Sequence, residues 1–532
     1  ALACAIGLTV KYGSAYRPVV EPVREIEEIW ALEDAREESE EPLVTRLFCN
    51  GIPMAYDAEN NVFYGSLGLE NGAQWPEIKL TASEETAKGL SLCFADDYGF
   101  DDCDAAIREG YSYQIFAYTD TAYSYAEVVF TGLPLVNVTA DQTIEREDVP
   151  ARIEIALAAE GLQTNGRIHK RGGASILNDK VGYKLEFTRT TDGKKKIYRE
   201  IPGMGTDSQV ILLPMNALDT TMMRDRLSWA LYARLTRRDE PFSARKTQYC
   251  ELFLNGEYRG VYLMLEPFSV RQEVAKAGEE RLTTDSVYRT AVISLSHGRP
   301  CMEDPYSAAT GFELYYPMDG EPDFSPLADY FALLGETDDA TFMRRAAQII
   351  DLDSALRYDV VLQLFGLTDN VINNMYTWAQ NSRGHTRYRF DFWDLDVSWG
   401  LKRDEIGEMH ENWVFFPLVD RLLCADEEGG VRKRYGEIYR EVREKAFDTE
   451  TVEALVGQYA HELNDSGAMA RNADRWETEN YAADGYELVA FAAERIALLD
   501  EPVRAMSAGE EIDLRFLEKT NYDDKGTPLS EE

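Results

Sequence analysis

Alternating apolar and polar positions predict that strands dominate the first half of the chain. Between residues 43 and 133, short runs of β-branched and aromatic residues are separated by turn residues, including Asn-Gly at 50–51 and 71–72. This texture predicts a small β-sandwich-like domain with an interaction or spacer role, because no catalytic constellation lies in it. We expect the next strands at 135–139, 151–157, 166–170, 182–188 and 209–213.

The pattern changes after these strands. Apolar residues at helical spacing predict an amphipathic helix over 219–235, with Asp219 as its N-cap. Two apolar runs, 249–254 and 258–265, then flank Asn255-Gly256. Asn-Gly favours the tight turn of a β-hairpin, because both residues tolerate a positive φ. We therefore expect a hairpin at this point.

After about residue 325 the pattern is mainly helical, interrupted by a strand pair at 374–379 and 387–393. Strands with one helix, followed by helices with a small hairpin, are typical of a two-lobed α+β arrangement. We expect four regions along the chain: an N-terminal remnant with an acidic linker over 1–42, the accessory β domain over 43–132, the main domain over 133–505, and an acidic, mobile tail over 506–532.

The charge balance narrows the class of partner. The 532 residues include 95 acidic and 55 basic side chains, a formal net charge of −40. Such a surface repels DNA, RNA and anionic lipid, since phosphate binding needs clustered Lys and Arg. It attracts basic protein segments, although solubility alone also explains an acidic surface.

The N-terminal residues and the cysteines bear on the compartment. Residues 1–10 form a short apolar run that we interpret as the remnant of a signal peptide or membrane anchor, and Leu2-Ala3-Cys4 faintly resembles a lipoprotein cleavage site. A buried strand or a ragged chain end is the alternative. The seven cysteines are too scattered for a zinc site, and pairing of Cys93 with Cys103 stays open.

The strongest chemical signal is a set of carboxylate and amide side chains around the second strand pair. Asp369 precedes Asn374 by five residues, the spacing found in the protein-kinase catalytic loop, and the following strand leads to Asp394 and Asp396. Phosphoryl transfer needs one Asp to position the acceptor hydroxyl, and an Asn and a further Asp to hold Mg²⁺. Each residue alone would more often form a turn or cap.

A second signal is the turn that begins at Arg171 and ends at Ser175. Its glycines let backbone N–H groups and the Ser175 hydroxyl approach phosphate oxygens. A lysine on the next strand, Lys180 or Lys184, is expected to contact the α and β phosphates. A hairpin with solvated lysines is the ordinary alternative.

Two further charged residues lie in apolar surroundings. Glu266 closes a strongly apolar strand, where a carboxylate is costly without a partner, so we expect an ion pair to Lys180 or Lys184. Arg224, at a predicted helix start, either clamps a phosphate or pairs with nearby acids.

These segments, in this order, resemble the CotH kinase family. The resemblance runs from residue 133 to about residue 505 and is carried by ordered blocks rather than by one motif. The blocks are Leu133-Pro-Leu-Val-Asn-Val, Lys170-Arg-Gly-Gly-Ala-Ser175, Tyr183-Lys-Leu, Ile211-Leu-Leu, Met223-Arg-Asp-Arg-Leu, Glu251 through Glu266, Ile350-Asp-Leu-Asp353, Asp369-Asn-x3-Asn374, Trp393-Asp-Leu-Asp396 and a C-terminal helix with Arg495.

The resemblance implies a two-lobed, atypical protein-kinase-like fold, here preceded by the small β-sandwich-like domain. It implies an enzyme outside the cytoplasm, secreted or anchored at a bacterial cell surface or spore layer, that uses ATP and Mg²⁺ or Mn²⁺ to phosphorylate serine on proteins. The implied catalytic residues are Asp369 and Asp396, and the implied metal ligands are Asn374, Asp394 and Asp396. The implied nucleotide-binding residues are Arg171, Ser175, Lys180, Lys184, Arg224 and Glu266.

The chain departs from the family pattern at the phosphate turn. The family turn usually has Asn and Ser where this chain has Gly173 and Ala174, and a Pro-Lys-Lys run where it has Asp179-Lys180-Val181. The change removes two polar groups and one positive charge. Either nucleotide binding is weaker, or other contacts compensate for those that are lost. The residues implied for metal binding are all present.

Other functions compete with a kinase. A pseudokinase or structural scaffold of an envelope or spore layer would keep the fold without the chemistry. A carbohydrate-binding module would use exposed tyrosines of the β region, namely Tyr111, Tyr113, Tyr118, Tyr123 and Tyr125. The sequence has no GxSxG, HExxH or Walker-type motif, which argues against the corresponding hydrolase and NTPase classes.

Overall fold

The computed structural model describes residues 18–22, 24–69, 78–83, 89–95, 103–172, 174–215, 219–290, 311–319, 321–336, 338–401, 413–414, 416–477 and 484–510. These residues form a mixed α+β protein with 23 strands and 13 α-helices, which confirms the predicted class. The chain divides into two compact units. Unit 1 is Ala1–Met215, Gln248–Glu266 and His461–Ala482, and unit 2 is Asn216–Thr247, Pro267–Ala460 and Ala483–Glu532.

The first part of unit 1 contains two sheets that share one apolar core. The larger sheet has the strand order β1-β8-β9-β10-β6-β5 with β2 added to β10, and the smaller has the order β4-β3-β7. Their bounds are β1 Val20–Glu21, β2 Glu37–Glu38, β3 Leu47–Cys49, β4 Ile52–Pro53, β5 Ala55–Asp57, β6 Val62–Ser66, β7 Leu80–Ala82, β8 Ser91–Phe94, β9 Ser112–Tyr118 and β10 Ala122–Thr131, with helices α1 Ile26–Asp34 and α2 Cys103–Arg108.

The alternation along β9 explains this packing. Tyr113, Ile115 and Ala117 point into the core shared by the two sheets, while Phe116 packs in a second cluster on the opposite face. Tyr118, Tyr123 and Tyr125 pack around Phe116, and the Tyr125 hydroxyl donates to Glu33 Oε1 at 2.7 Å. These tyrosines therefore serve packing.

One expectation for this region needs correction, and one open question has an answer. Part of the segment expected to be an acidic linker belongs to the sheet, because β1 pairs with β8 and β2 pairs with β10. Cys93 and Cys103 are both buried thiols in different apolar clusters, so the disulfide between them that the sequence left open is not formed.

The second part of unit 1 is a closed barrel of seven strands in the order β11-β12-β13-β14-β17-β19-β18. Its strands are β11 Leu135–Thr139, β12 Val149–Leu157, β13 Glu160–Arg171, β14 Gly182–Thr188, β17 Gln209–Leu213, β18 Thr247–Leu254 and β19 Glu257–Leu265, and β15 Arg199–Ile201 pairs with β16 Gly205–Asp207 beside them. All the predicted strands and the Asn255-Gly256 hairpin are present, and both turn residues have positive φ.

Helix α12, Ala468–Trp476, packs on β19 of the barrel. The approach is close at Gly260, whose φ is +84°, because a Cβ there would lie 2.4 Å from Asn472 Oδ1. Arg471 on the same helix pairs with the fully buried Glu251 of β18 through its Nη2 at 2.8 Å. The Tyr258 hydroxyl also donates to Glu251, at 2.6 Å.

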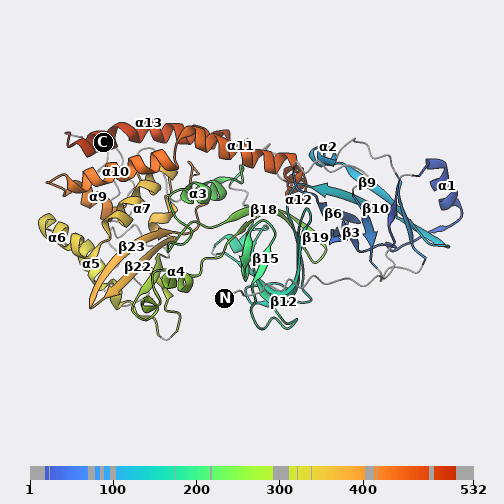
Figure 1. The fold of residues 1–532 in the computed structure, drawn as a ribbon, viewed down its shortest axis with the longest axis horizontal. Coiled ribbons are helices and arrows are strands. Elements are labelled where there is room, and N and C mark those ends of the chain that lie inside the picture. Colours follow the sequence, from blue (N-terminus) through green and yellow to red (C-terminus); the bar gives the residue numbers. More distant parts are fainter. Residues whose placement is uncertain are drawn as a thin grey trace, which may run out of the picture. The chain divides into compact units, whose positions relative to one another are not determined.

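Unit 2 combines a four-stranded sheet with most of the helices. The sheet order is β21-β20-β22-β23, with β20 Ser286–Thr290, β21 Phe312–Tyr316, β22 Met375–Ser382 and β23 His385–Phe392. The remaining helices are α3 Arg224–Tyr232, α4 Val270–Lys276, α5 Ala328–Leu334, α6 Asp339–Ile349, α7 Leu352–Phe365, α8 Asp369–Ile372, α9 Pro417–Cys424, α10 Gly430–Lys445, α11 Thr449–Asp465 and α13 Tyr486–Ala508. Helix α7 lies beside β23, and α10 packs against α7 and α13 (Figure 1).

Helix α3 starts later than the sequence predicts. Asp219 is not the N-cap, because the helix begins at Arg224 after Met223. Instead, the Asp219 carboxylate accepts the backbone N–H groups of Thr221 and Arg224 at 3.2 and 3.1 Å, which orders the segment before the helix. Among the described helices, none is long and apolar enough to cross a membrane. The expected N-terminal anchor lies outside the described residues.

Candidate functional site

Asp369 and Asn374 come together at one end of the β22–β23 hairpin. Asp369 begins α8 and is 3% exposed, and Asn374 directly precedes β22. The Asn374 Nδ2 donates to Asp369 Oδ2 at 2.9 Å, and Asn373 Nδ2 donates to Asp369 Oδ1 at 3.3 Å. Asn374 Oδ1 accepts no hydrogen bond from the described residues, so the amide oxygen can take a ligand.

Asp394 and Asp396 follow β23 at the same end of this hairpin. Trp393 N donates to Asn374 O at 3.0 Å, and Asn370 Nδ2 donates to Trp393 O at 2.7 Å, so the backbones of the two segments are tied together. Asn374 and Asp394 both have φ of +57°. This left-handed conformation favours Asn and Asp over other side chains, and it occurs often at functional sites.

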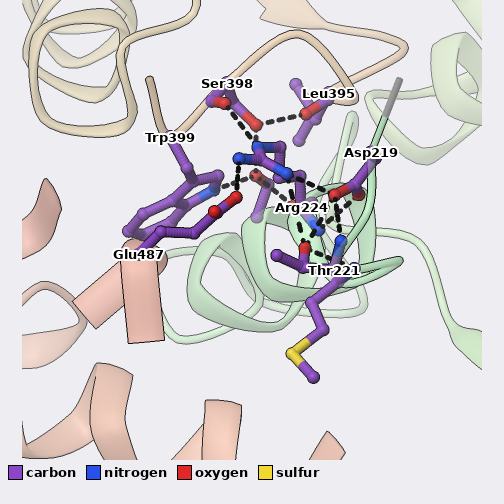
Figure 2. Close-up of polar contacts among 9 residues, drawn as sticks. Asp219, Thr221, Arg224, Leu395, Ser398, Trp399 and Glu487 are labelled. Atoms are coloured by element: carbon purple, nitrogen blue, oxygen red, sulfur yellow. Dashed lines mark hydrogen bonds and ion pairs between the residues drawn. The ribbon is translucent and has the colours of Figure 1, made fainter. Parts of the chain in front are cut away.

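Arg224 holds the loop that carries Asp394 and Asp396. Its Nε donates to Ser398 O at 3.2 Å, and its Nη1 and Nη2 bind Asp219 and Glu487 (Figure 2). Arg224 is only 4% exposed. The second of the two interpretations offered from the sequence, pairing with nearby acids, therefore describes its contacts. We place Arg224 as a positioning residue for the loop.

The other end of this loop is fixed by a small polar cluster. Ser398 Oγ donates to Leu395 O at 2.7 Å, and the Trp399 indole N–H donates to Ser228 Oγ at 2.9 Å (Figure 2). Ser228 Oγ donates in turn to Arg224 O at 2.7 Å on α3. The short segment after β23 is thus bound to α3 along its length.

Asp225 is a site residue that the sequence did not single out. It lies on α3, is 4% exposed, and is close enough to Asp394 for the charge of Asp394 to act on it. Burial and, to a smaller extent, the charge of Asp394 together raise the pKa of Asp225 to about 8, although a hydrogen bond from the Leu395 backbone acts to lower it. An acid within the charged run Arg224-Asp225-Arg226 gives no sequence signal of such a location.

The oxygen atoms around this loop fit a hard divalent cation. Asn374, Asp394 and Asp396 offer only amide and carboxylate oxygens, the donors that Mg²⁺ and Mn²⁺ prefer. Asp225 adds a buried carboxylate whose Oδ1 accepts no hydrogen bond from the described residues. Among the described residues, no three His, Cys, Asp or Glu side chains are grouped closely enough to hold a metal by themselves. A metal here would therefore rely on the Asn374 amide and on a nucleotide or water.

In unit 1, the Lys180 side chain is held by two neutral acceptors. Its Nζ donates to Val261 O at 2.6 Å and to Asn472 Oδ1 at 2.8 Å, and it lies 5.0 Å from the centre of the Tyr262 ring. Burial lowers the pKa of Lys180 to about 7. Asn472 Oδ1 also accepts Val261 N at 3.0 Å, so α12 fixes both the lysine and the strand.

The ion pair expected between Glu266 and Lys180 or Lys184 is not formed. Lys180 reaches neutral acceptors, as described above. Lys184 lies on β14 between the core residues Tyr183 and Leu185, so the alternation of the strand turns it to the outer face of the barrel. Burial and the charge of Lys196 lower its pKa. Glu266 follows β19 and is partly buried.

The turn expected to approach phosphate is tight. Arg171 is the last residue of β13, and Ser175 lies in a 3₁₀ segment, Ala174–Leu177. Gly172 has φ of +130°, and a Cβ there would lie 2.4 Å from Ser175 Oγ. Only glycine fits this position. Gly173 lies outside the described residues.

Comparison with known proteins agrees with the resemblance drawn from the ordered blocks. A family model described as CotH kinase protein matches residues 168–499, which is more than half of the chain. The match contains every site residue named above. No curated protein sequence matches the chain at a significant level.

Proposed function

The chain belongs to the CotH kinase family, and on that premise we propose that it is an ATP- and divalent-metal-dependent protein kinase that phosphorylates serine or threonine. The observation that carries the proposal is the Asp369–Asn374 hydrogen bond at the end of the hairpin that leads to Asp394 and Asp396. This arrangement supplies a carboxylate for the acceptor hydroxyl and oxygen ligands for a metal within one compact unit.

In the proposed reaction, the hydroxyl oxygen of the acceptor forms a bond to the γ-phosphorus of ATP. The bond from that phosphorus to the β–γ bridging oxygen breaks, and ADP leaves. Asp369 orients the hydroxyl and accepts its proton, while Asn374, Asp394 and Asp396 are the residues that would hold a metal ion. Such an ion, when bound, would neutralise charge on the nucleotide phosphates.

Lys180 is the residue of unit 1 that we assign to the nucleotide phosphates. Its ammonium group already has two directed hydrogen bonds, and neither acceptor carries a charge that would compete with phosphate. Lys184 lacks such fixed contacts and lies near Lys196 and Glu186. We therefore favour Lys180, with Asn472 as its positioning residue.

We also propose that the acceptor is a basic, serine-rich protein and that the kinase acts outside the cytoplasm. The net charge of −40 supports the first point, because it attracts basic chains and repels nucleic acid. Membership of the CotH kinase family supports the second, because the resemblance implies a kinase of the secreted type.

A transfer assay tests the proposal. The protein is incubated with labelled ATP, Mg²⁺ or Mn²⁺, and a lysine- and serine-rich acceptor. We expect label on serine or threonine, and a loss of at least about 100-fold for Asp369→Ala and for Asp396→Ala, because each removes a group that acts on the reacting atoms. Asp319→Ala is the matched control, since Asp319 is exposed and distant in sequence from the loop.

Two outcomes would contradict the proposal: no transfer by the wild-type protein with either metal, or undiminished transfer by Asp396→Ala. Absence of nucleotide binding in a metal-dependent thermal-shift titration would favour the scaffold function instead. The altered turn at 171–175 is the feature that would then account for lost nucleotide binding.

A further inference from the structure

Unit 2 contains a cavity that the proposed reaction does not use. Its volume is about 360 Å³, and it is walled by the segment after α3, the start of α7 and the strands β22 and β23. Aromatic side chains form much of the wall. The ring centres of Tyr358 and Phe392 are 4.1 Å apart in a stacked arrangement, and those of Trp378 and Phe242 are 5.0 Å apart. The volume is at the small end for ligand sites, so it suits a group the size of one amino acid.

The charged residues around the cavity are already paired, with one exception. Each of the other three lining carboxylates pairs with an arginine: Glu240 with Arg237 at 3.8 Å, Asp351 with Arg389 at 3.5 Å, and Asp353 with Arg434 at 2.7 Å. The two lining arginines are likewise engaged: Arg389 with Asp351, and Arg357 with Glu441 at 3.6 Å. Among the described residues, Asp391 is the lining carboxylate that has no basic partner.

Asp391 is buried but accessible from the cavity. It is 6% exposed, and its Oδ1 accepts the Tyr232 hydroxyl at 2.8 Å and the Phe392 N–H at 2.7 Å. Its Oδ2 accepts no hydrogen bond from the described residues, and Asp391 lines the cavity. The charge of Arg245 acts on Asp391, but Arg245 itself forms an ion pair with Glu273 at 2.9 Å.

A buried carboxylate without a cation is costly, and a group that brings one would relieve that cost. Burial raises the pKa of Asp391 to about 7, which reflects this cost. The aromatic walls suit the same kind of group, since a cation is stabilised over the face of an aromatic ring, as Arg389 already is at 5.7 Å from the centre of the Trp378 ring. An anionic guest would meet the Asp391 carboxyl and gain no free cation.

We infer that this cavity binds the basic side chain of a lysine or arginine on the protein that the kinase phosphorylates, with Asp391 as its counter-ion. The identity of the guest as part of the acceptor protein rests on the proposed function. The cavity then selects acceptors whose serine lies near a basic residue. Tyr232 is the positioning residue, because its hydroxyl fixes Oδ1 and leaves Oδ2 toward the guest.

Binding of small probes tests the inference without any reaction. The wild-type protein is titrated with Nα-acetyl-arginine amide and with Nα-acetyl-citrulline amide, which has nearly the same shape and no charge, by calorimetry or by the fluorescence of the tryptophans. We expect the arginine probe to bind at least ten-fold more tightly. Asp391→Asn should remove that difference, while Asp339→Asn should retain it, because Asp339 is exposed and pairs with Arg421 outside the cavity.

A transfer assay adds the link to the acceptor. For a serine peptide with a neighbouring arginine, Asp391→Asn should raise KM at least ten-fold with little change in kcat, and the citrulline peptide should show no such effect. Equal binding of the two probes by the wild-type protein would overturn the inference, and this comparison needs no variant. Unchanged binding of the arginine probe by folded Asp391→Asn would overturn it as well.

The two proposals fail in different ways. If the arginine probe binds as expected but no phosphoryl transfer occurs, the proposed function fails and the cavity remains a site for basic groups. If transfer occurs but the probes bind equally, the kinase stands and the cavity is not its selectivity site.

Discussion

Exchange of Asn472 for aspartate should change how the protein takes up a proton when it binds ATP. Lys180 has a pKa of about 7 in the free protein, so at pH 8 about one tenth of it is charged. Phosphate oxygens favour the charged form, and binding should therefore draw in roughly 0.9 proton. In Asn472→Asp a carboxylate replaces the amide oxygen that lies 2.8 Å from Nζ. The lysine is then charged beforehand, and the uptake should fall to about zero.

Calorimetry measures this quantity directly. ATP with Mg²⁺ is titrated at pH 8 in two buffers of different ionisation enthalpy, and the slope of the heat against that enthalpy gives the protons taken up. The added carboxylate also offsets the lysine charge, so we expect ATP affinity to fall about ten- to 100-fold. Asn472→Ala should weaken binding less, because it removes an acceptor without adding charge.

Lys180→Met is the control, since any proton exchanged by groups other than Lys180 is common to all variants. The difference between the wild-type protein and Lys180→Met isolates Lys180. Equal proton uptake by the wild-type protein, Lys180→Met and Asn472→Asp would refute the assignment of Lys180 to the phosphates.

Three further predictions concern stability, measured by urea unfolding. In the folded chain the pKa of Lys180 is about 7, below its usual 10.5, so the unfolded chain binds more protons between pH 7 and pH 10.5. The free energy of unfolding should therefore rise over this range by up to about 1.4 kcal/mol per pH unit. Lys180→Met should remove that slope. Gly260→Ala should cost at least about 1–3 kcal/mol through its positive φ and its contact with Asn472, whereas an alanine that leaves stability unchanged would contradict the close approach. Glu251→Gln should cost about 3–5 kcal/mol, since it leaves Arg471 charged and buried without its partner.

Local patterns were sufficient to predict the strands of the barrel. The strands 135–139, 182–188 and 209–213 agree with the structure residue for residue, because alternation every second residue is a local property of the chain. The start of α3 was misplaced because Asp219 resembles an N-cap. Its carboxylate instead binds a backbone N–H five residues later, at the true first residue of the helix.

The partners of the site residues could not be predicted in the same way. Lys180 contacts Asn472, which is 292 residues away along the chain, and no local pattern connects the two. The expected acidic partner was reasoned from charge alone, and the structure satisfies the lysine with neutral acceptors. Asp225 was missed because its location beneath the loop depends on how α3 packs, which spacing in the sequence does not reveal.

The contribution of α12 to the barrel has a consequence for biosynthesis. The hairpin β18–β19 is complete at residue 265, but the helix that supplies Arg471 and Asn472 ends only at Trp476. At about 5–20 residues per second, synthesis of the chain from residue 265 to residue 476 takes roughly 10–40 s. During this time Glu251 has no ion pair with Arg471. A nascent chain in this interval lacks the contacts between α12 and the barrel, which makes it a ready client for chaperones.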